Sequence, residues 1–218
     1  MAMRHDDVYE FDDLPINGVP RGTNLLLAGP TLGGTRDLLL RLLLGEAGVL
    51  IITADSSASK TLSEFERVGG RVDRDRVRVV SCTQERDDDH GELVASVGSP
   101  GDLTGIGIEY SGQYEQVYAR GYDTVRTGIY TLTPLLVFGS DVRPVFRFVN
   151  TVTSRIRMAD GLGVCAIDPS AHDDRVVSSI AQPFDGRIDV RETDDGIELR
   201  VTGLRDQPTE WTGVPALE

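Results

Sequence analysis

Lysine is nearly absent from this chain of 218 residues: Lys60 is the only one, and the other 21 basic residues are arginine. Acidic residues outnumber basic ones by 35 to 22, which gives a formal net charge of -13. Because neutralising nucleic-acid phosphates requires a basic face, this balance argues against nucleic acid as a partner. Abundant short carboxylates and few lysine stems instead indicate a surface that stays soluble in concentrated salt.

Other features are scarce as well. The two cysteines, Cys82 and Cys165, are too few and too far apart for a disulfide framework or a cysteine metal cluster. No apolar run approaches the roughly 20 residues that a membrane-spanning helix needs. The first 13 residues, MAMRHDDVYEFDD, are charged and contain no apolar stretch of the kind found in secretory signals. We therefore expect a cytoplasmic protein without a membrane span.

Short apolar runs alternate along the chain with segments of helical length. Strands are expected at 23–28, 49–53, 76–81, 124–132 and 162–167, and helices at 35–46, 56–68, 111–120, 142–158 and 173–181. Two alternating strands follow at 186–192 and 197–202, separated by the turn sequence Asp194-Asp195-Gly196. This order predicts an α/β fold: a doubly wound, mainly parallel sheet flanked by helices, with an antiparallel hairpin at its C-terminal edge.

The most informative segment is the glycine-rich loop between the first strand and the first helix. Such a loop lets backbone N–H groups surround a phosphate at the positive end of a helix. The pattern that does this chemistry is G-x-x-x-x-G-K-[ST], and Gly29 and Gly34 have its spacing. The lysine position, however, is Thr35, and the position of the magnesium-binding hydroxyl is Arg36. The scaffold of a phosphate loop is present, and the two side chains that neutralise phosphate and hold Mg²⁺ are not.

The order of segments resembles the RecA/KaiC-like superfamily of P-loop ATPases. The run NGVPRGTNLLLAGPTLGGTRD, followed by GEAGVLIITADSS, is similar to its first strand, loop, helix and second strand. Later segments, YDTVRTGIYTLTPLLVF and FDGRIDVRE, are similar to its Walker B strand and a late strand. The segment SPGDLTGIGI further resembles an uncharacterised haloarchaeal group in that superfamily. The resemblance covers 17–205, which leaves an N-terminal extension at 1–16 and a tail at 206–218.

The resemblance implies a role for particular positions. Gly29, Gly33 and Gly34 correspond to loop glycines, Thr35 to the lysine, Arg36 to the magnesium-binding hydroxyl, Asp55 to the carboxylate that activates water, and Tyr130 and Thr131 to the Asp-Ser of the Walker B strand. A phenol has a pKa near 10 and cannot replace a carboxylate around Mg²⁺. ATP and Mg²⁺ are therefore weakly supported as cofactors, although the superfamily binds both.

Three functional hypotheses follow. The first is a catalytically degenerate protein that acts as a regulatory or scaffold component through contacts with a protein partner or with copies of itself. The alternative is an ATP-binding switch or slow ATPase in which Arg36 replaces the missing lysine. The superfamily also keeps open a recombination accessory on DNA, which the negative charge disfavours.

The remaining polar candidates have simpler interpretations. Asp55 is a weak candidate for a general base, and its place before Ser56 and Ser57 favours a helix N-cap instead. The acidic segments Asp87–His90 and His172–Asp174 lack the regular ligand spacing of a calcium loop. We interpret both as solvated loops or caps, and we predict no metal site. Asp168, at the end of a strand, is expected to shape its loop rather than to contact a ligand.

Overall fold

The computed structural model of the chain describes residues 8–31, 33–83, 91–139 and 141–216. Its centre is a nine-stranded sheet in the order β11-β10-β9-β3-β8-β7-β4-β5-β6. The strands of the parallel part are β3 (Asn24–Ala28), β4 (Gly48–Thr53), β5 (Val77–Ser81), β6 (Val94–Ser96), β7 (Val125–Tyr130) and β8 (Leu162–Ile167). Strand β9 (Gly186–Thr193) lies parallel to β3 and pairs antiparallel with β10 (Gly196–Thr202), which in turn pairs antiparallel with β11 (Thr212–Gly213). The predicted α/β fold with its antiparallel hairpin is confirmed.

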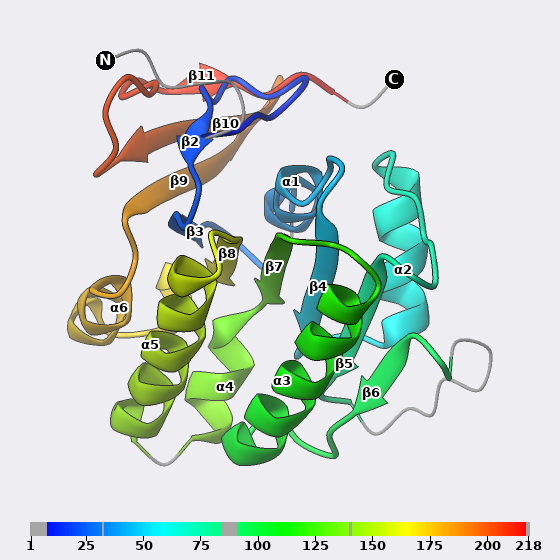
Figure 1. Cartoon of the computed structure of the whole chain (residues 1–218). Helices are drawn as coiled ribbons and strands as arrows, with labels where there is room; N and C mark the ends of the chain where they lie inside the picture. The colour runs from blue at the N-terminus through cyan, green and yellow to red at the C-terminus, as the bar shows by residue number, and fades with distance from the viewer. Residues whose placement is uncertain (1–7, 32, 84–90, 140, 217–218) are drawn as a thin grey trace.

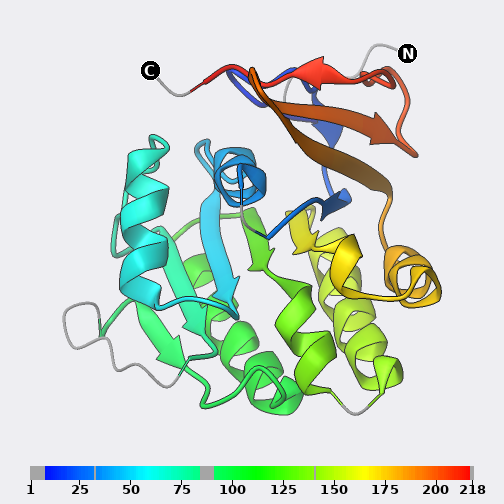
Figure 2. The same ribbon diagram turned by 180° about the vertical axis from the view of Figure 1, so that it is seen from behind.

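Helices cover both faces of the sheet (Figures 1 and 2). Helices α1 (Thr35–Leu42) and α2 (Ala58–Arg67) pack on one face. Helices α3 (Leu103–Ala119), α4 (Leu132–Phe138), α5 (Val142–Met158) and α6 (Asp174–Ala181) pack on the other, and a short 3₁₀ turn spans Pro169–Ala171. Successive side chains of a strand enter opposite layers: Leu25 and Leu27 lie in the α1 layer, and Leu26 lies in the α5 layer. This two-sided burial explains why the central strands are uniformly apolar in sequence.

The described part of the N-terminal segment belongs to the same core. Strands β1 (Val8–Tyr9) and β2 (Val19–Pro20) pair antiparallel, and the side chains of Tyr9 and Phe11 are buried against the α1 layer. Arg126, from β7, lies 5.0 Å from the Tyr9 ring centre and donates to the carbonyls of Leu42, at 3.0 Å, and Glu10, at 3.4 Å. One buried guanidinium thus fastens the N-terminal segment to the sheet. Burial lowers the pKa of Arg126 to about 10, so that it stays charged at neutral pH.

Two helices differ from the sequence prediction. Helix α3 begins at Leu103 rather than at 111, because Asp102 caps it by accepting the N–H of Gly105 at 2.8 Å. Helix α4 occupies residues that were assigned in part to the preceding strand; it begins after Thr131, whose hydroxyl accepts the N–H of Thr133. In both places a side-chain cap starts a helix inside a segment whose composition favours a loop or a strand.

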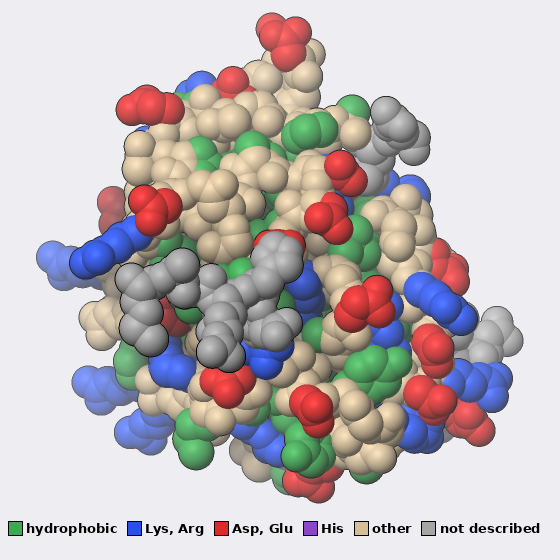
Figure 3. All heavy atoms as spheres, turned by 45° about the horizontal axis from the view of Figure 1, so that its top comes forward, with side chains coloured by type: hydrophobic (Ala, Val, Ile, Leu, Met, Phe, Trp, Pro, Cys, Tyr) green, Lys and Arg blue, Asp and Glu red, His purple; other side chains and the backbone are tan. Residues whose placement is uncertain are grey.

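The outer surface mixes both charges. On the face shown in Figure 3, Asp and Glu side chains lie interspersed with arginines. Several described arginines form ion pairs with nearby carboxylates, among them Arg157 with Asp185 and Arg191 with Glu198. Within the described ranges, no helix combines the length and the apolar character that crossing a membrane requires.

Candidate functional site

The positions that sequence comparison singles out meet at one edge of the sheet. The glycine-rich loop follows β3, Asp55 lies just beyond β4, Tyr130 ends β7, and Asp168 follows β8. These strands are adjacent, in the order β3-β8-β7-β4, and run parallel, so their carboxyl ends lie side by side. In doubly wound sheets this edge is where ligands bind.

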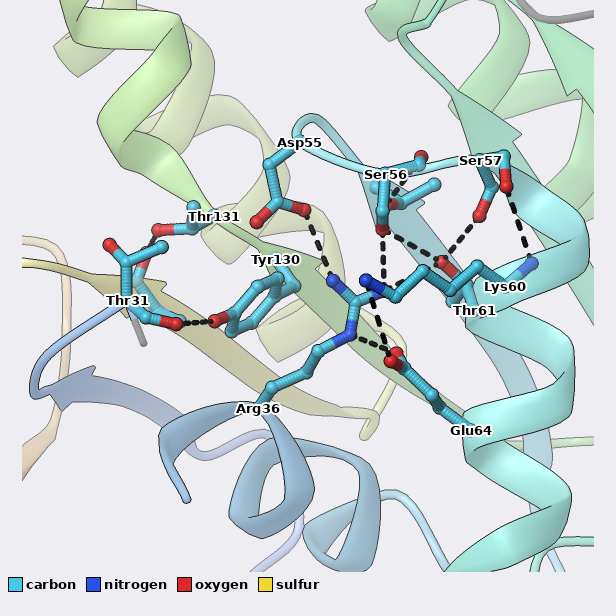
Figure 4. Close-up of polar contacts among 12 residues, drawn as sticks. Thr31, Arg36, Asp55, Ser56, Ser57, Lys60, Thr61, Glu64, Tyr130 and Thr131 are labelled. Atoms are coloured by element: carbon cyan, nitrogen blue, oxygen red, sulfur yellow. Dashed lines mark hydrogen bonds and ion pairs between the residues drawn. The ribbon is translucent and has the colours of Figure 1, made fainter. Parts of the chain in front are cut away.

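Arg36 lies at the centre of this edge, with its guanidinium directed between α1 and α2 (Figure 4). Its side chain is 12% exposed; Nη1 lies 3.2 Å from Asp55 Oδ1, and Nε forms an ion pair with Glu64 of α2. Nη2 donates to the hydroxyls of Ser56, at 2.5 Å, and Thr61, at 3.0 Å. Two carboxylates and two hydroxyls therefore surround the one charge near the loop that could have replaced the missing lysine.

Tyr130 fills the space beside Arg36. The Arg36 guanidinium carbon lies 4.7 Å from the centre of the Tyr130 ring, and the phenol is 3% exposed. Its hydroxyl donates to the backbone carbonyl of Thr31 at 3.0 Å. Burial, assisted by the Asp55 carboxylate, raises the pKa of Tyr130 to about 12, so that it remains a proton donor at neutral pH. At the position that the family resemblance assigns to Walker B, this chain thus carries a neutral group that donates to the loop.

Asp168 holds the loop from the opposite side. Its Oδ2 accepts both the backbone N–H and the hydroxyl of Thr31, each at 3.0 Å, and its Oδ1 accepts the N–H and hydroxyl of Ser170. Burial raises the pKa of Asp168, but these hydrogen bonds outweigh it, and the net pKa is lowered. Thr31 is therefore held at its N–H, its hydroxyl and its carbonyl, and the loop is latched at that residue.

Replacing Thr31 by valine should raise the pKa of Asp168, because the carboxylate loses the hydroxyl bond that favours its charged form. In the wild type we expect this carboxyl to titrate below the ordinary value of about 3.9. A lowered folded-state pKa means that the latch contributes stability above pH 4 and loses it as the pH falls through that pKa. The measurement is the ¹³C chemical shift of the Asp168 carboxyl against pH. An unchanged midpoint in Thr31→Val would contradict the latch.

The loop glycines are required by contacts within the chain. A Cβ at Gly34 would stand 2.6 Å from Cγ2 of Ile197, and a Cβ at Gly29 would stand 2.8 Å from Cβ of Val190. A Cβ at Gly33, where φ is +143°, would collide with the side chain of Glu192. These three contacting residues belong to the β9–β10 hairpin, and a Cβ at Gly29 would in addition stand 2.6 Å from Oγ1 of Thr35 on α1. The hairpin therefore packs on the loop closely enough to explain its glycines without a phosphate.

The hydroxyls of Thr131 and Thr35, both at this edge, differ in their hydrogen bonding. Thr131 donates to the carbonyl of Ala166 at 2.8 Å and also caps α4, so it serves the fold. Thr35, at the lysine position, is 1% exposed, and its Oγ1 lacks a hydrogen-bond partner among the described residues. Nε of Arg36 also lacks a hydrogen-bond partner among these residues, but it forms an ion pair with Glu64, which Thr35 cannot do.

The interpretation of Asp55 as the cap of α2 is wrong. Helix α2 begins at Ala58, and its N-cap is Ser57, whose hydroxyl accepts the N–H of Lys60 at 3.4 Å. Asp55 lies before the turn into the helix and is directed at Arg36 instead (Figure 4). Burial raises the pKa of Asp55, and the nearby Arg36 charge opposes that rise.

Sequence reasoning missed Glu64 and Thr31. A signal for Glu64 existed: Thr61 and Glu64 lie one helical turn apart and border the apolar face of α2 formed by Leu62 and Phe65. Among the residues with described positions, no cluster of three or more His, Cys, Asp or Glu side chains could hold a metal ion. The acidic segment Asp87–His90 lies outside the described residues. In the second segment, burial lowers the pKa of His172, and the nearby Asp168 charge opposes that change.

Comparison with known proteins agrees with this geometry. Residues 22–190 match a family of unknown function, DUF7504. The chain belongs to this family. No curated protein matches it. The DUF7504 match runs from just before β3 to the middle of β9, and so contains Arg36, Tyr130 and Asp168.

Two solved structures share the fold of this DUF7504 protein. One is the KaiC-like protein PH0186 from the hyperthermophilic archaeon Pyrococcus horikoshii OT3, with a TM-score of 0.60 and 14% identity over 94% of this chain and 90% of that one. The other is the flagellar accessory protein FlaH from Methanocaldococcus jannaschii, with a TM-score of 0.58 and 13% identity over 90% and 84% of the two chains. At this identity the likeness shows the RecA/KaiC-like fold.

Proposed function

We propose that this protein is a catalytically degenerate member of the RecA/KaiC-like fold that acts as a regulatory or scaffold component through protein contacts. The observation that carries the proposal is the state of Arg36. Its guanidinium is paired with Asp55 and Glu64, so that a nucleotide phosphate would have to displace two carboxylates to reach it. In this arrangement the former phosphate edge serves to join α1 to α2.

Two further features support the same proposal. Tyr130 stands where the magnesium-binding carboxylate would be expected, and its buried phenol bonds to the loop carbonyl of Thr31. The hairpin residues Val190 and Ile197 pack against the loop glycines from outside. Of the side chains at the corresponding positions, Arg36 and Tyr130 have partners within the chain, whereas Thr35 Oγ1 has no hydrogen-bond partner among the described residues.

The solved structures support the proposal in a more general way. One of them is itself named an accessory protein, of the archaeal flagellum, and both come from archaea. An arginine-rich, lysine-poor and strongly acidic composition supports an archaeal cytoplasm rich in salt as the setting for this chain. Assays of function therefore belong in concentrated KCl.

The proposal predicts that the protein neither hydrolyses ATP nor binds it well. Titration calorimetry with Mg-ATP in molar KCl should give no binding tighter than about 100 μM, which corresponds to roughly −5.5 kcal/mol. A phosphate-release assay should show no Mg²⁺-dependent turnover. Hydrolysis that disappears on substitution of Arg36, in a variant whose thermal melt shows that it is folded, would refute the proposal.

The alternative, an ATP-binding switch or slow ATPase, has one observation in its favour. Thr35 Oγ1 is buried beside Gly29 without a hydrogen-bond partner among the described residues, as expected of a hydroxyl that forms a hydrogen bond only with a bound ligand. If that is its role, ATP should bind tighter than about 100 μM, and Thr35→Val should weaken binding by about tenfold. Equal and weak ATP affinity in wild type and Thr35→Val favours the scaffold.

A further inference from the structure

An apolar groove separates the first half of α3 from the first half of α5, on the face of the sheet opposite to α1. It is open to solvent, has a volume of about 670 Å³, and is lined mainly by apolar or uncharged residues. The α3 wall is formed by Leu103, Thr104, Gly107, Ile108 and Ser111, and the α5 wall by Pro144, Arg147, Phe148 and Thr151. At one end Arg155 closes the groove by donating to the hydroxyl of Ser111 at 2.7 Å and lying over the Tyr114 ring.

The residues of α3 keep this groove open. Gly107 lines it, and no atom lies within 4 Å of the place that a Cβ there would take. Glycine inside a helix costs about 1 kcal/mol relative to alanine, so Gly107 weakens α3 without serving a contact within the described chain. A helix backbone left bare in this way lets a second element approach closely, which is a reason to place glycine there.

Exposed apolar side chains border the groove. Ile108 forms its rim and is 66% exposed, a large fraction for a residue of this size. Phe138, at the end of α4, is also 66% exposed. Its Cβ lies 3.6 Å from the position that a Cβ of Gly101 would take. Gly101 stands two residues before Leu103, which begins α3 and lines the groove. Exposed apolar side chains beside an apolar groove are typical of a surface that binds another molecule.

The charged side chains at the groove indicate which kind of partner would fit it. Arg147 is the only charged residue of the lining, and neither it nor Arg143, one turn earlier, forms an ion pair with another described residue. The N-cap carboxylates Asp102 and Asp141 stand at the starts of the two helices. In a chain of net charge -13, where Arg36 and Arg155 have carboxylate partners, Arg147 is a positive charge in the groove itself. A partner with carboxylates beside its apolar anchors would complement it.

The dimensions favour a helix over a second copy of the chain. From Thr104 to Ser111 the groove follows about two turns of α3, roughly 10 Å, which suits two anchor side chains one turn apart. A stable dimer buries about 1,600 Å², far more than this groove offers by itself. We propose that the α3–α5 groove binds an acidic amphipathic helix of a partner protein. This inference rests on the proposed scaffold function and names the surface that would carry it.

Two synthetic peptides test the proposal. Both are helical, about 16 residues long, and carry the same leucine and phenylalanine anchors one turn apart; one has glutamates flanking the anchors and the other has lysines. Binding to the full chain is followed by fluorescence anisotropy in KCl. The acidic peptide should bind at least about tenfold tighter than the basic one, and Arg147→Glu should abolish that preference. Arg175→Glu, at an exposed arginine of α6, is the matched control and should leave it unchanged.

A second pair of variants isolates the groove itself. Gly107→Leu fills the groove and should weaken the acidic peptide by about tenfold or more. Gly112→Leu makes the same change on the same helix, at a position that also has open space but does not line the groove, and should have no effect. Both variants should melt as single transitions, because a Cβ at either position meets no atom within 4 Å and the rest of the side chain can extend toward solvent or the open groove.

Several results would overturn the inference: no binding of either peptide, equal binding of both, or equal effects of the two leucine variants. Light scattering on the wild type adds another, because a dimer that Gly107→Leu dissociates would make a second copy the occupant. Failure of the proposed function shows differently. ATP turnover would refute the degenerate site and leave the peptide preference intact, whereas failure of the peptides leaves the nucleotide assays unchanged.

Discussion

Replacing Arg36 by methionine is expected to lower the free energy of unfolding by about 3 kcal/mol. Methionine retains most of the apolar stem, so the loss reflects the charge rather than the packing. Without the guanidinium, Asp55, 22% exposed, loses its ion pair, and Glu64, 21% exposed, keeps only Lys60, whose Nζ lies 3.9 Å from its Oε1. The stacking on Tyr130 is lost as well. Chemical denaturation in KCl measures the change.

Arg67 provides the matched control. It forms an ion pair with Asp37 across the same two helices, but the side chains are 50% and 34% exposed. An exposed pair of this kind is worth at most about 1 kcal/mol, so Arg67→Met should change stability little. If the two variants lost equally little, the Arg36 charge would not be committed to α1–α2 packing, and it would be available for phosphate.

This comparison separates the two functional candidates by their stability effects alone. A residue kept for a ligand is commonly neutral or unfavourable for the empty protein, whereas a residue kept for the fold stabilises it. A large loss in Arg36→Met together with undetectable ATP binding in the wild type would support the scaffold. A neutral effect on stability together with measurable ATP binding would support the switch.

The sheet could be predicted because its strands are buried on both faces. Residues 162–167 form β8 and residues 142–158 form α5, at the predicted boundaries. A short, uniformly apolar run is typical of a buried strand, and a long apolar stripe at helical spacing is typical of an amphipathic helix. Helix α3 could not be delimited, since Gly105 and Gly107 are typical of loops and only the Asp102 cap and burial of Ile106 make the segment helical.

The site was predictable in its positions and not in its contacts. Spacing from the loop glycines places Arg36 at the phosphate edge, the family resemblance assigns Tyr130 to it, and departures from the motif indicate which chemistry is missing. Their partners lie on other elements: Glu64, on α2, pairs with Arg36, and Thr31, in the loop, accepts from Tyr130 and is itself held by Asp168 after β8. Pairing between segments this far apart leaves no periodic signal in a single sequence. For the same reason, the hairpin was predicted as an edge of the sheet, and its packing on the loop was not.

Gly34→Ala is expected to destabilise the protein by about 2 kcal/mol, because its Cβ would overlap the side chain of Ile197. The backbone itself tolerates alanine: φ is −69° and ψ is −3°, an ordinary helical conformation. The cost is therefore one of space. Gly112→Ala, on the open side of α3, is the control and should instead gain about 0.5–1 kcal/mol.

The double variant decides why this glycine is there. Ile197→Ala removes the obstacle, so Gly34→Ala should be milder in that background, with a favourable coupling of about 1–2 kcal/mol in denaturation experiments. A glycine kept for the hairpin requires that coupling, since Gly34 and Ile197 then share one contact. If the two changes simply add, the hairpin does not account for Gly34, and close approach of a phosphate to the backbone becomes the better reason for a glycine at the start of α1.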